Sequence, residues 1–431
     1  MKKENPHKNR ICGQPSGTAM EIFSAAVSGL AAWESDGLSL DDVLDFRAPA
    51  KIRRSISSIL FAFFRNKAAI EALIAAHSRE NKPSVARVLK VALAEMQFQT
   101  GLPRELAASI AVDYAKAKFG VRPAGFINAV LRRAGTLEMD KFLAGQAEHV
   151  HLNLPRALYE KWRSAHGAEK LCALASALRK EAALSFRFTG ETCATEELLA
   201  KIESKELVLP EWAGGYRFFS TARFELLAES GLLKESGIYI QDPSTVLAPS
   251  LLPLSGHERV LDLCAAPGGK AGLLAERLPK GFLVAGDRSW QRQRRTSENL
   301  LRFSGRTAVL VSSALEPAYC PGSFDAVLLD VPCSNTGVAR RRPDALWRYT
   351  ESRQAELAAL QKKMLEQAAP LLRPGGSLVY STCSIEEEEN AAQVRAFLES
   401  HRDFSLLREE RILPSAFHDG AYAALLMLSA E

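Results

Sequence analysis

The chain has 431 residues, which is long enough for two or three domains with cores of their own. Hydrophobic residues make up 47% of it and charged residues 24%, a balance typical of globular proteins, and no stretch approaches the run of about 20 apolar residues that a membrane span needs. The net charge of +5 is compatible with a nucleic-acid partner but does not require one. The start, Met1–Pro6, is polar with no apolar core behind its charges, so we expect no secretory signal, no membrane partner and a cytoplasmic location.

The cysteines and histidines exclude two further classes. The seven cysteines include no C-x-x-C pair and the eight histidines form no H-E-x-x-H array, so we expect neither a disulfide framework nor a metal site. Free thiols in a reducing compartment are the simplest interpretation. A cysteine with a special role is then a nucleophile.

The first part of the chain is predicted to be helical. Residues 1–17 are expected to form a disordered tail, and residues 18–145 show apolar side chains at helical spacing. Val85–Met96 has them at i, i+3, i+4 and i+7, which indicates one buried helical face, and residues 105–118 and 124–133 repeat the pattern. We therefore expect an all-helical domain over residues 18–145.

A smaller module is predicted over residues 146–235. Residues 155–166 have a helical pattern with Trp162 on the apolar side. Residues 183–188 alternate between apolar and polar side chains, as a half-buried strand does, and residues 195–204 have a helical pattern again. Because the two patterns mix, we expect a small α+β fold here.

The remainder, residues 236–431, alternates between short apolar runs and helical stretches. This alternation predicts an α/β domain of the Rossmann-like type, in which a parallel sheet has helices on both faces and ligands lie beyond the carboxyl ends of the strands. The predicted strands are Arg259–Leu263, Phe282–Gly286, Ala308–Val311, Ala326–Leu329 and Ser377–Ser381.

Two motifs at predicted strand ends suit a ligand. In Val260-Leu-Asp-Leu-Cys-Ala-Ala-Pro-Gly-Gly-Lys270 a strand leads into paired glycines and a helix start, where backbone approaches a ligand closely and N–H groups are free. The pattern is not G-x-G-x-x-G, so a dinucleotide fingerprint does not fit. Asp287 ends the next strand, where a carboxylate can accept hydrogen bonds from ribose hydroxyls. A plain turn and a surface aspartate are the structural alternatives.

Two cysteines follow later strands. Asp330-Val-Pro-Cys333 ends one of them and Ser381-Thr-Cys383 the other. Free cysteine is among the most buried residue types, so one such cysteine alone favours a structural role. Two such cysteines at the ligand-binding edge of the sheet indicate a catalytic role instead. Structural roles are expected for the other thiols, Cys12, Cys172, Cys193, Cys264 and Cys320.

Together these motifs resemble those of the RsmB/NOP family of RNA 5-methylcytosine methyltransferases. The resemblance implies a class I methyltransferase domain that uses S-adenosylmethionine. It also implies that the cofactor contacts the first loop together with Asp287, Ser313 and Asp330. The loop residues expected at the cofactor are Cys264, Ala265, Ala266, Pro267, Gly268, Gly269 and Lys270.

The resemblance assigns the catalytic residues as well. In this family the thiol after Thr attacks C6 of the cytosine, which implies Cys383, and the thiol after Pro assists product release, which implies Cys333. A thiolate suits the reaction because it is a strong, soft nucleophile and a good leaving group. Asp330 would hold the N3/N4 edge of the base. Glu388–Asn390 also matches the family, while Ser384–Glu387 predicts a capped helix start and no metal site.

The helical domain carries its own resemblance. Residues 88–98, 102–109 and 125–133 resemble the NusB RNA-binding fold, and this fold precedes the catalytic domain in the branch that methylates 16S ribosomal RNA. The resemblance thus covers nearly the whole chain and implies an enzyme that acts on 16S rRNA, with the target cytosine extruded or presented unpaired. We expect a monomer, although the sequence does not determine the oligomeric state. The side chains expected to contact RNA are Arg187, Arg340, Arg341 and Arg342.

The chain departs from the family pattern at three places. Ser313 stands where the family has an aspartate near the adenine, Asn335 replaces a glycine, and His418–Tyr422 lacks a double aromatic. Asparagine reaches positive φ more readily than most residues, so the second change is tolerable. Two alternatives stay open: a transfer-RNA methyltransferase with the same chemistry, and a non-catalytic RNA-binding assembly factor. The NusB-like domain argues against the transfer-RNA enzyme, and the intact cysteines argue against the assembly factor. Ser313, in place of the aspartate, is the one feature that favours the assembly factor.

Overall fold

The protein is described by a computed structural model that covers residues 17–47, 49, 51–78, 82–189, 195–233 and 237–430. The chain divides into two compact units, Met1–Ala175 with Arg342–Trp347, and Ser176–Arg341 with Arg348–Glu431. Most of the predicted disordered tail, together with Cys12 and Cys193, lies outside the described residues; Gly17 begins the first helix.

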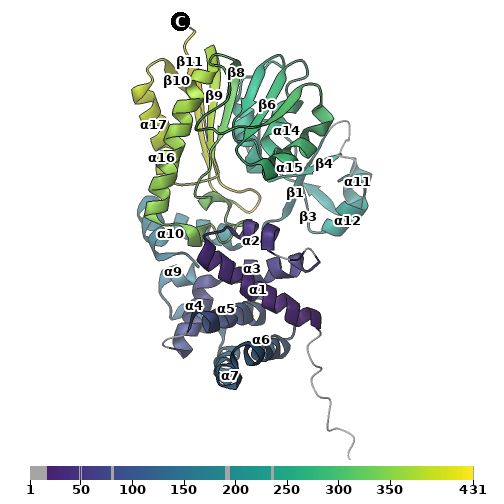
Figure 1. Ribbon diagram of the computed structural model, residues 1–431, viewed down its shortest axis with the longest axis vertical. Helices are drawn as coiled ribbons and strands as arrows, with labels where there is room; N and C mark the ends of the chain where they lie inside the picture. Colours follow the sequence, from purple (N-terminus) through teal and green to yellow (C-terminus); the bar gives the residue numbers. More distant parts are fainter. Residues whose placement is uncertain are drawn as a thin grey trace, which may run out of the picture. The chain divides into compact units, whose positions relative to one another are not determined.

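The first unit is helical, as predicted. Its helices are α1 (Gly17–Asp36), α2 (Leu40–Arg47), α3 (Arg53–Arg65), α4 (Lys67–His77), α5 (Pro83–Phe98), α6 (Arg104–Phe119), α7 (Val121–Gly135), α8 (Met139–Ala144), α9 (Glu148–His151) and most of α10 (Arg156–Arg179), shown from purple to blue in Figure 1. The apolar spacing explains the core, because Val85, Val88, Leu89, Ala92 and Met96 of α5 are all buried.

This unit extends beyond residue 145, where the sequence predicts a boundary. The buried side chain of Asn153 ties the chain after α9 to the earlier helices. Its Oδ1 accepts a hydrogen bond from the Ala68 N–H at 2.9 Å, and its Nδ2 donates to the Phe64 carbonyl at 3.2 Å. The two units therefore divide within α10, in which Trp162 is buried as predicted.

A late stretch of the sequence, Arg342–Trp347, also belongs to the helical unit. The buried carboxylate of Asp344 accepts a hydrogen bond from Trp33 Nε1 at 3.2 Å. The indole N–H of Trp347 donates to the Phe64 carbonyl at 3.0 Å. The chain thus leaves the second unit after Arg341, packs within the first, and returns at Arg348.

The second unit begins with a four-stranded antiparallel sheet in the order β2-β3-β1-β4. Its elements are β1 (Leu184–Phe188), α11 (Glu196–Lys201), β2 (Ser204–Glu206), β3 (Phe219–Thr221), α12 (Phe224–Glu229) and β4 (Ile238–Ile240). The alternation predicted in β1 places Phe186 in a small apolar core with Phe219 and Ile238. The predicted α+β fold is therefore present, and it ends slightly beyond residue 235.

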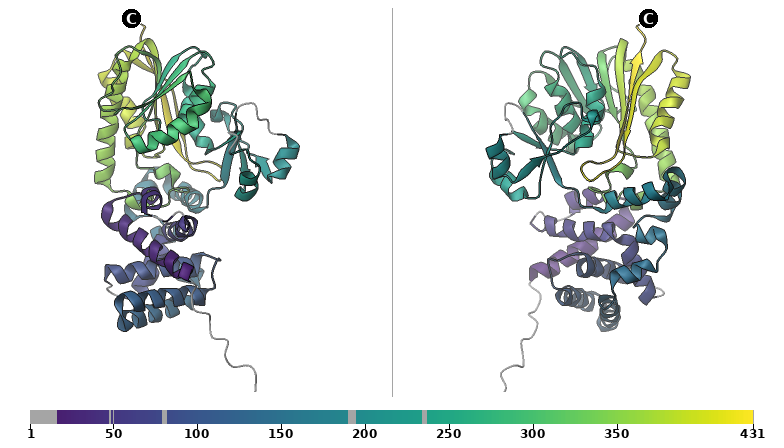
Figure 2. Two further views of the ribbon diagram at one scale, coloured as in Figure 1. Left: turned by 45° about the vertical axis from the view of Figure 1, so that its right-hand side comes forward. Right: turned by 180° about the vertical axis from the view of Figure 1, so that it is seen from behind.

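A larger sheet of seven strands follows, in the order β10-β11-β9-β8-β5-β6-β7 (Figures 1 and 2). The strands are β5 (Arg259–Asp262), β6 (Phe282–Asp287), β7 (Thr307–Val311), β8 (Phe324–Asp330), β9 (Leu372–Thr382), β10 (Phe404–Ile412) and β11 (Ala421–Leu428). Neighbours among β5 to β9 are parallel, whereas β11 pairs antiparallel with β9 and β10. All five predicted strands are present; β10 and β11 were not predicted.

Alternating side chains bury both faces of this sheet. Val260 packs on the face covered by α13 (Leu247–Leu251), α14 (Gly269–Glu276) and α15 (Trp290–Leu300). Leu261 packs on the opposite face. The helices α16 (Glu351–Ala368) and α17 (Ala391–Ser400) cover that face (Figure 2). This is the doubly covered sheet that the sequence predicted.

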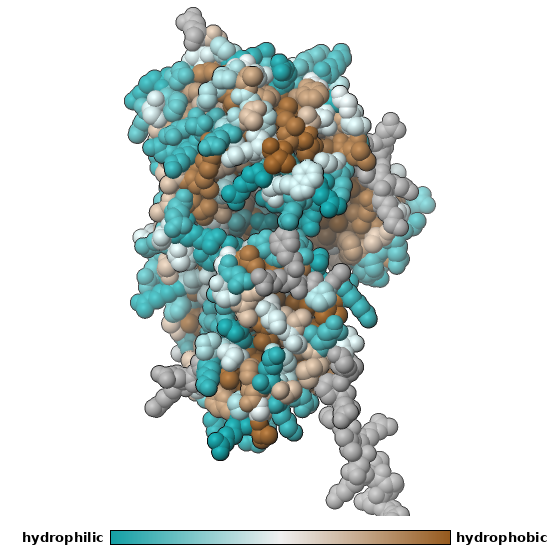
Figure 3. Space-filling view, viewed as in Figure 1, coloured by the Kyte–Doolittle hydropathy of each residue, from teal (hydrophilic) through white to brown (hydrophobic). Residues whose placement is uncertain are grey.

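The visible surface in Figure 3 is mainly hydrophilic, with apolar side chains gathered in small patches. None of the helices in the described part of the chain is long and apolar enough to cross a membrane.

Candidate functional site at the carboxyl edge of the sheet

The side chains singled out in the sequence meet at one edge of the larger sheet. Asp287 ends β6, Asp330 ends β8, and Cys383 directly follows β9. Strand register makes neighbours of Asp330 and Ser381 across β8 and β9. Because parallel strands end at the same edge, the sequence could predict this gathering without predicting any distance.

Glycines shape the loop between β5 and α14. Gly268 has φ of +101°, where a side chain is strained, and a Cβ there would lie 3.2 Å from the Thr296 Cα, a tighter contact than most Cβ atoms make. A Cβ on Gly269 would lie 3.2 Å from Gln241 Nε2. The loop therefore leaves bare backbone at the start of α14, where helix N–H groups are unpaired.

Asp287 is fixed beside this loop. Its Oδ2 accepts a hydrogen bond from the Ala266 N–H at 3.3 Å and its Oδ1 from the Ser289 N–H at 2.9 Å. Ser313 follows β7, and its Oγ accepts a hydrogen bond from the Leu315 N–H at 3.2 Å. Each carboxylate oxygen of Asp287 keeps a lone pair for a ligand.

A charged cluster lies at the ends of β5 and β8. Lys270 Nζ is 2.5 Å from Asp330 Oδ2, and Ser381 Oγ donates to Asp330 Oδ1 at 3.0 Å. Burial lowers the pKa of Lys270, but the charge and hydrogen bond of Asp330 more than offset it, so that pKa is raised. Lys270 is thus held as a cation that fixes the Asp330 carboxylate.

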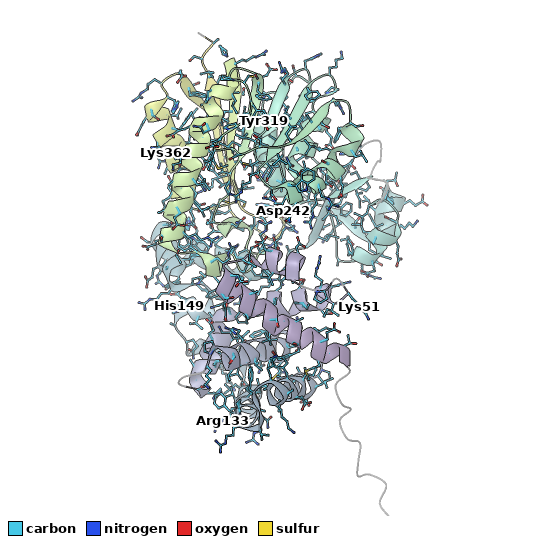
Figure 4. The ribbon with its side chains drawn as sticks, viewed as in Figure 1. Lys51, Arg133, His149, Asp242, Tyr319 and Lys362 are labelled. Atoms are coloured by element: carbon cyan, nitrogen blue, oxygen red, sulfur yellow. The ribbon has the colours of Figure 1, made fainter. Side chains whose placement is uncertain are left out.

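Asp262 lies in the same cluster and is fully buried. No side chain of the described residues donates a hydrogen bond to its carboxyl oxygens. Burial raises its pKa to about 8, with help from the charges of Asp330 and Asp287 and against the effect of Lys270 and the Cys264 backbone. Tyr319, labelled in Figure 4, is half-buried near Asp262.

The two cysteines are brought into contact, with their Sγ atoms 3.2 Å apart. Cys333 is buried and Cys383 is half-buried. The hydrogen bond with Cys383, followed by burial and the charges of Cys383 and Glu389, raises the pKa of Cys333 well above its usual range. Asn335 Oδ1 accepts a hydrogen bond from Cys383 Sγ at 3.0 Å. Among the described residues, no group of three or more His, Cys, Asp or Glu side chains is arranged to hold a metal ion.

Two of these side chains were not predicted to act at the site. Asn335 adopts the expected positive φ, of 60°, but its side chain also contacts the Cys383 thiol. Glu389 was predicted within a helix start; it instead ends a short 3-10 turn, Glu387–Glu389, and is fully buried whereas Glu387 and Glu388 are exposed. The sequence cannot show which carboxylate of this run is buried, because neighbouring residues in it are all glutamate.

Two of the four arginines expected to contact RNA are buried instead. Arg340 is 2% exposed, and its guanidinium donates to the Ser415 and Ala416 carbonyls at 2.7 and 3.0 Å. Arg187 is 3% exposed and pairs with Glu276 at 2.8 Å. Both guanidinium groups are taken up by bonds within the protein, Arg187 by an ion pair and Arg340 by backbone carbonyls, so the structure gives no support to a contact with RNA phosphates. A charged residue type does not disclose that its side chain is buried.

Arg341 and Arg342 differ from each other. Arg341 is half-buried and bridges two buried carboxylates, Asp242 at 2.8 Å and Asp419 at 3.0 Å (Asp242 is labelled in Figure 4). Burial and the Asp242 charge raise the pKa of Asp419 to about 7, and Arg341 offsets part of this. Arg342 has a side chain that is 51% exposed, in an ion pair with Asp41 at 2.9 Å. Its contact with RNA stays a prediction.

A pocket opens beside Cys333 within the second unit. It lies where the loop after β8 faces the start of α16 and includes the cationic side chains of Arg348 and Arg353. Its lining residues are Cys333, Ser334, Asn335, Arg348, Tyr349, Thr350, Arg353, Gln354 and Leu357.

Comparison with known proteins identifies the family. The family model described as 16S rRNA methyltransferase RsmB/F matches residues 249–424, and the NusB family model matches residues 21–135. Ribosomal RNA small subunit methyltransferase B of Proteus mirabilis is 30% identical to this chain over 95% of it and 99% of the relative. The chain belongs to the RsmB/F family.

One further relative and one solved structure are also similar to this chain. Ribosomal RNA small subunit methyltransferase B of Erwinia tasmaniensis is 33% identical over 74% of this chain and 75% of the relative. The crystal structure of PH0851 has a TM-score of 0.75 at 24% sequence identity, covering 96% of this chain and 99% of that one, which shows a shared fold. Membership in the RsmB/F family confirms the predicted S-adenosylmethionine-dependent RNA methyltransferase and its NusB-like helical region.

The residues at the sheet edge fit S-adenosylmethionine. The glycine loop offers bare backbone and a helix start, and Asp287 offers a carboxylate held by two backbone N–H groups. The buried Asp262 and the Lys270–Asp330 pair supply further polar groups at the same edge of the sheet. Ser313 offers a single hydroxyl at the end of β7, where an aspartate was expected from the family pattern.

Proposed function

We propose that this chain transfers a methyl group to C5 of a cytosine in 16S ribosomal RNA through a covalent bond between Cys383 and C6 of the base, acting as a cytoplasmic monomer. The observation that carries the proposal is the pair of thiols, 3.2 Å apart at the edge where β8 and β9 end. Relatives named for the methylation of small-subunit ribosomal RNA support the choice of RNA.

The two thiols have different parts in the proposed reaction. Cys383, as a thiolate, forms a bond from Sγ to C6, which pushes electron density to C5 so that C5 can take the methyl group. The C5 proton then passes to solvent, the C6–S bond breaks, and Cys383 leaves as a thiolate. The Cys333 thiol is close enough to donate a hydrogen bond to that leaving sulfur.

Asp330 would hold the base. Its carboxylate is fixed by Lys270 on one oxygen and by Ser381 on the other. It can accept a hydrogen bond from the N4 amino group and so orient the ring with C6 towards Cys383. A hydrogen bond that orients the ring during attack lowers the barrier to the reaction, whereas one that only binds the base in the ground state does not.

S-adenosylmethionine supplies an electrophilic methyl group on its sulfonium when bound. The proposed contacts are the backbone of the loop, the Asp287 carboxylate for the ribose hydroxyls, and Ser313 and Asp330 beside them. The loop residues are Cys264, Ala265, Ala266, Pro267, Gly268, Gly269 and Lys270.

Three cations are proposed to hold RNA. Arg348 and Arg353 line the pocket beside Cys333, and Arg342 is exposed on the helical unit. Each can neutralise a phosphate, a contact that positions the strand without reading its sequence. Binding should weaken with rising salt for the same reason.

The proposal is tested with 16S rRNA from a strain that lacks the enzyme and radiolabelled S-adenosylmethionine. Cys383→Ala should lose detectable methylation, and Cys333→Ala should accumulate an RNA–protein adduct that survives denaturing electrophoresis. Cys172→Ala is the matched control, since this thiol is exposed and remote in sequence from both motifs. Full activity of Cys383→Ala would contradict the mechanism, and label found in transfer RNA alone would contradict the substrate.

A further inference from the structure

A fully buried carboxylate, that of Glu389, lies behind the two cysteine loops. Glutamate is almost never fully buried unless it is paired. Here the paired groups are uncharged hydrogen-bond donors. Its Oε2 accepts hydrogen bonds from the Ser334 N–H at 2.8 Å and from Gln361 Nε2 at 3.0 Å, and its Oε1 accepts from Ser384 Oγ at 3.0 Å.

These bonds reach both catalytic loops. Ser334 is the residue after Cys333, and Ser384 is the residue after Cys383. Gln361, itself fully buried on α16, also donates to the Pro332 carbonyl at 3.0 Å, so the chain is held on both sides of Cys333. One carboxylate therefore connects the loop after β8 to the loop after β9.

The carboxylate is itself held in place. The Tyr380 hydroxyl, on β9, donates to the Glu389 carbonyl at 2.7 Å. Ser384 Oγ lies 3.1 Å from Ser334 Oγ and 3.2 Å from Thr336 Oγ1, which adds direct bonds between the loops. These bonds hold the two loops together, although one buried atom of the network, Gln361 Oε1, has no hydrogen-bond partner among the described residues.

We propose that Glu389 is a positioning residue for methyl transfer: its carboxylate fixes both cysteine loops, so that the two thiols keep their separation and their different roles. The inference rests on the proposed function, since it needs both thiols to act. Glu389 contacts neither thiol directly in the hydrogen bonds of the structure, and its effect passes through Ser334 and Ser384.

The charge of Glu389 adds a second effect. After the hydrogen bond with Cys383 and burial, the charges of Cys383 and Glu389 help to raise the pKa of Cys333. Cys333 therefore stays a hydrogen-bond donor, which can stabilise a thiolate on Cys383 before attack and after release. Removal of the charge should let Cys333 ionise more readily and compete as a nucleophile.

Glu389→Gln removes the charge and keeps the size, and Glu387→Gln is the matched control on the same turn, because Glu387 is exposed. We expect Glu389→Gln to slow methyl transfer by about 10- to 100-fold with little change in the KM for RNA, and to shift alkylation of Cys333 by iodoacetamide to lower pH. Binding of S-adenosylmethionine, measured by calorimetry, should stay within about twofold of wild type, since no hydrogen bond of Glu389 goes to the cofactor loop.

Glu389→Asp separates reach from charge. Its shorter side chain keeps the charge but cannot span both loops, so transfer should fall while Cys333 alkylation keeps its wild-type pH profile. Wild-type transfer and an unchanged Cys333 profile in Glu389→Gln, or wild-type transfer in Glu389→Asp, would overturn the inference. Loss of S-adenosylmethionine binding in both variants would also overturn it, by showing a role in folding. Activity of Cys383→Ala would instead refute the proposed function.

Discussion

Replacement of Asp262 by asparagine should make the second unit less sensitive to pH. Asp262 is fully buried, and folding raises its pKa from 3.8 to about 8. An acid whose pKa rises on folding binds its proton more tightly in the native state. Its contribution to stability is therefore fully present below pH 3.8 and is lost as the pH rises through about 8.

The magnitude follows from the shift. About 4 pKa units correspond to about 6 kcal/mol at most, since each unit is worth about 1.4 kcal/mol. Ionisation at high pH also sets Asp262 against Asp330 and Asp287, with Lys270 alone in opposition among the charged side chains that affect it. Relaxation around the new charge will reduce the effect, so we expect a loss of several kcal/mol between pH 5 and 9.

Urea denaturation across this pH range measures the effect. The midpoint of wild type should fall relative to that of Asp262→Asn as pH rises, and the variant should be the more stable protein at pH 9. Asp403→Asn, at an exposed aspartate, serves as the control for the substitution itself. Parallel curves for wild type and Asp262→Asn would refute the reasoning from burial.

Three further predictions concern other charges. Glu95 is buried on α5, with one oxygen unpartnered and a pKa raised by burial from 4.5 to about 7. The contribution of Glu95 to stability is lost as the pH rises from 4.5 through 7. Thermal denaturation should therefore show Glu95→Gln to be more stable than wild type by up to about 3 kcal/mol at pH 8, with little difference at pH 4. Equal effects at the two pH values would contradict this. Arg341→Met should lower the free energy of unfolding in urea by about 3 kcal/mol at pH 8, because Asp242 and Asp419 are left buried without a cation, and by less at pH 5. An equal loss at the two pH values would count against these ion pairs. Lys270→Met should slow methyl transfer about 100-fold by freeing Asp330, and an unchanged rate in a filter-binding methylation assay would argue against that role.

Much of the fold could be predicted because local patterns and burial agree. The short apolar runs before Asp262 and Asp330 are buried on both faces, as a parallel sheet requires. The last two strands were missed for a physical reason. β11 (Ala421–Leu428) is rich in alanine, leucine and methionine, which favour helices, and β10 (Phe404–Ile412) has four charged residues in a row among its nine. Pairing with β9 overrides these propensities.

The candidate site divides in the same way. Residues that stand at strand ends, such as Asp287 and Cys383, could be placed from the sequence because topology alone brings them together. The partners of Glu389 and Arg340 could not, because their contacts join segments far apart in the sequence. The 3.2 Å between the cysteine sulfurs likewise depends on the loops and not on the strands that precede them.

The excursion of Arg342–Trp347 limits how this protein can be divided or recombined. A fragment that starts after Ala175 would carry Trp347, an apolar side chain packed against the core of the helical unit, with nothing to cover it. A fragment that ends there would leave Trp33 without its bond to Asp344. Transplanting the helical unit onto another methyltransferase would therefore require the recipient to carry a matching stretch downstream of its own Pro-Cys segment.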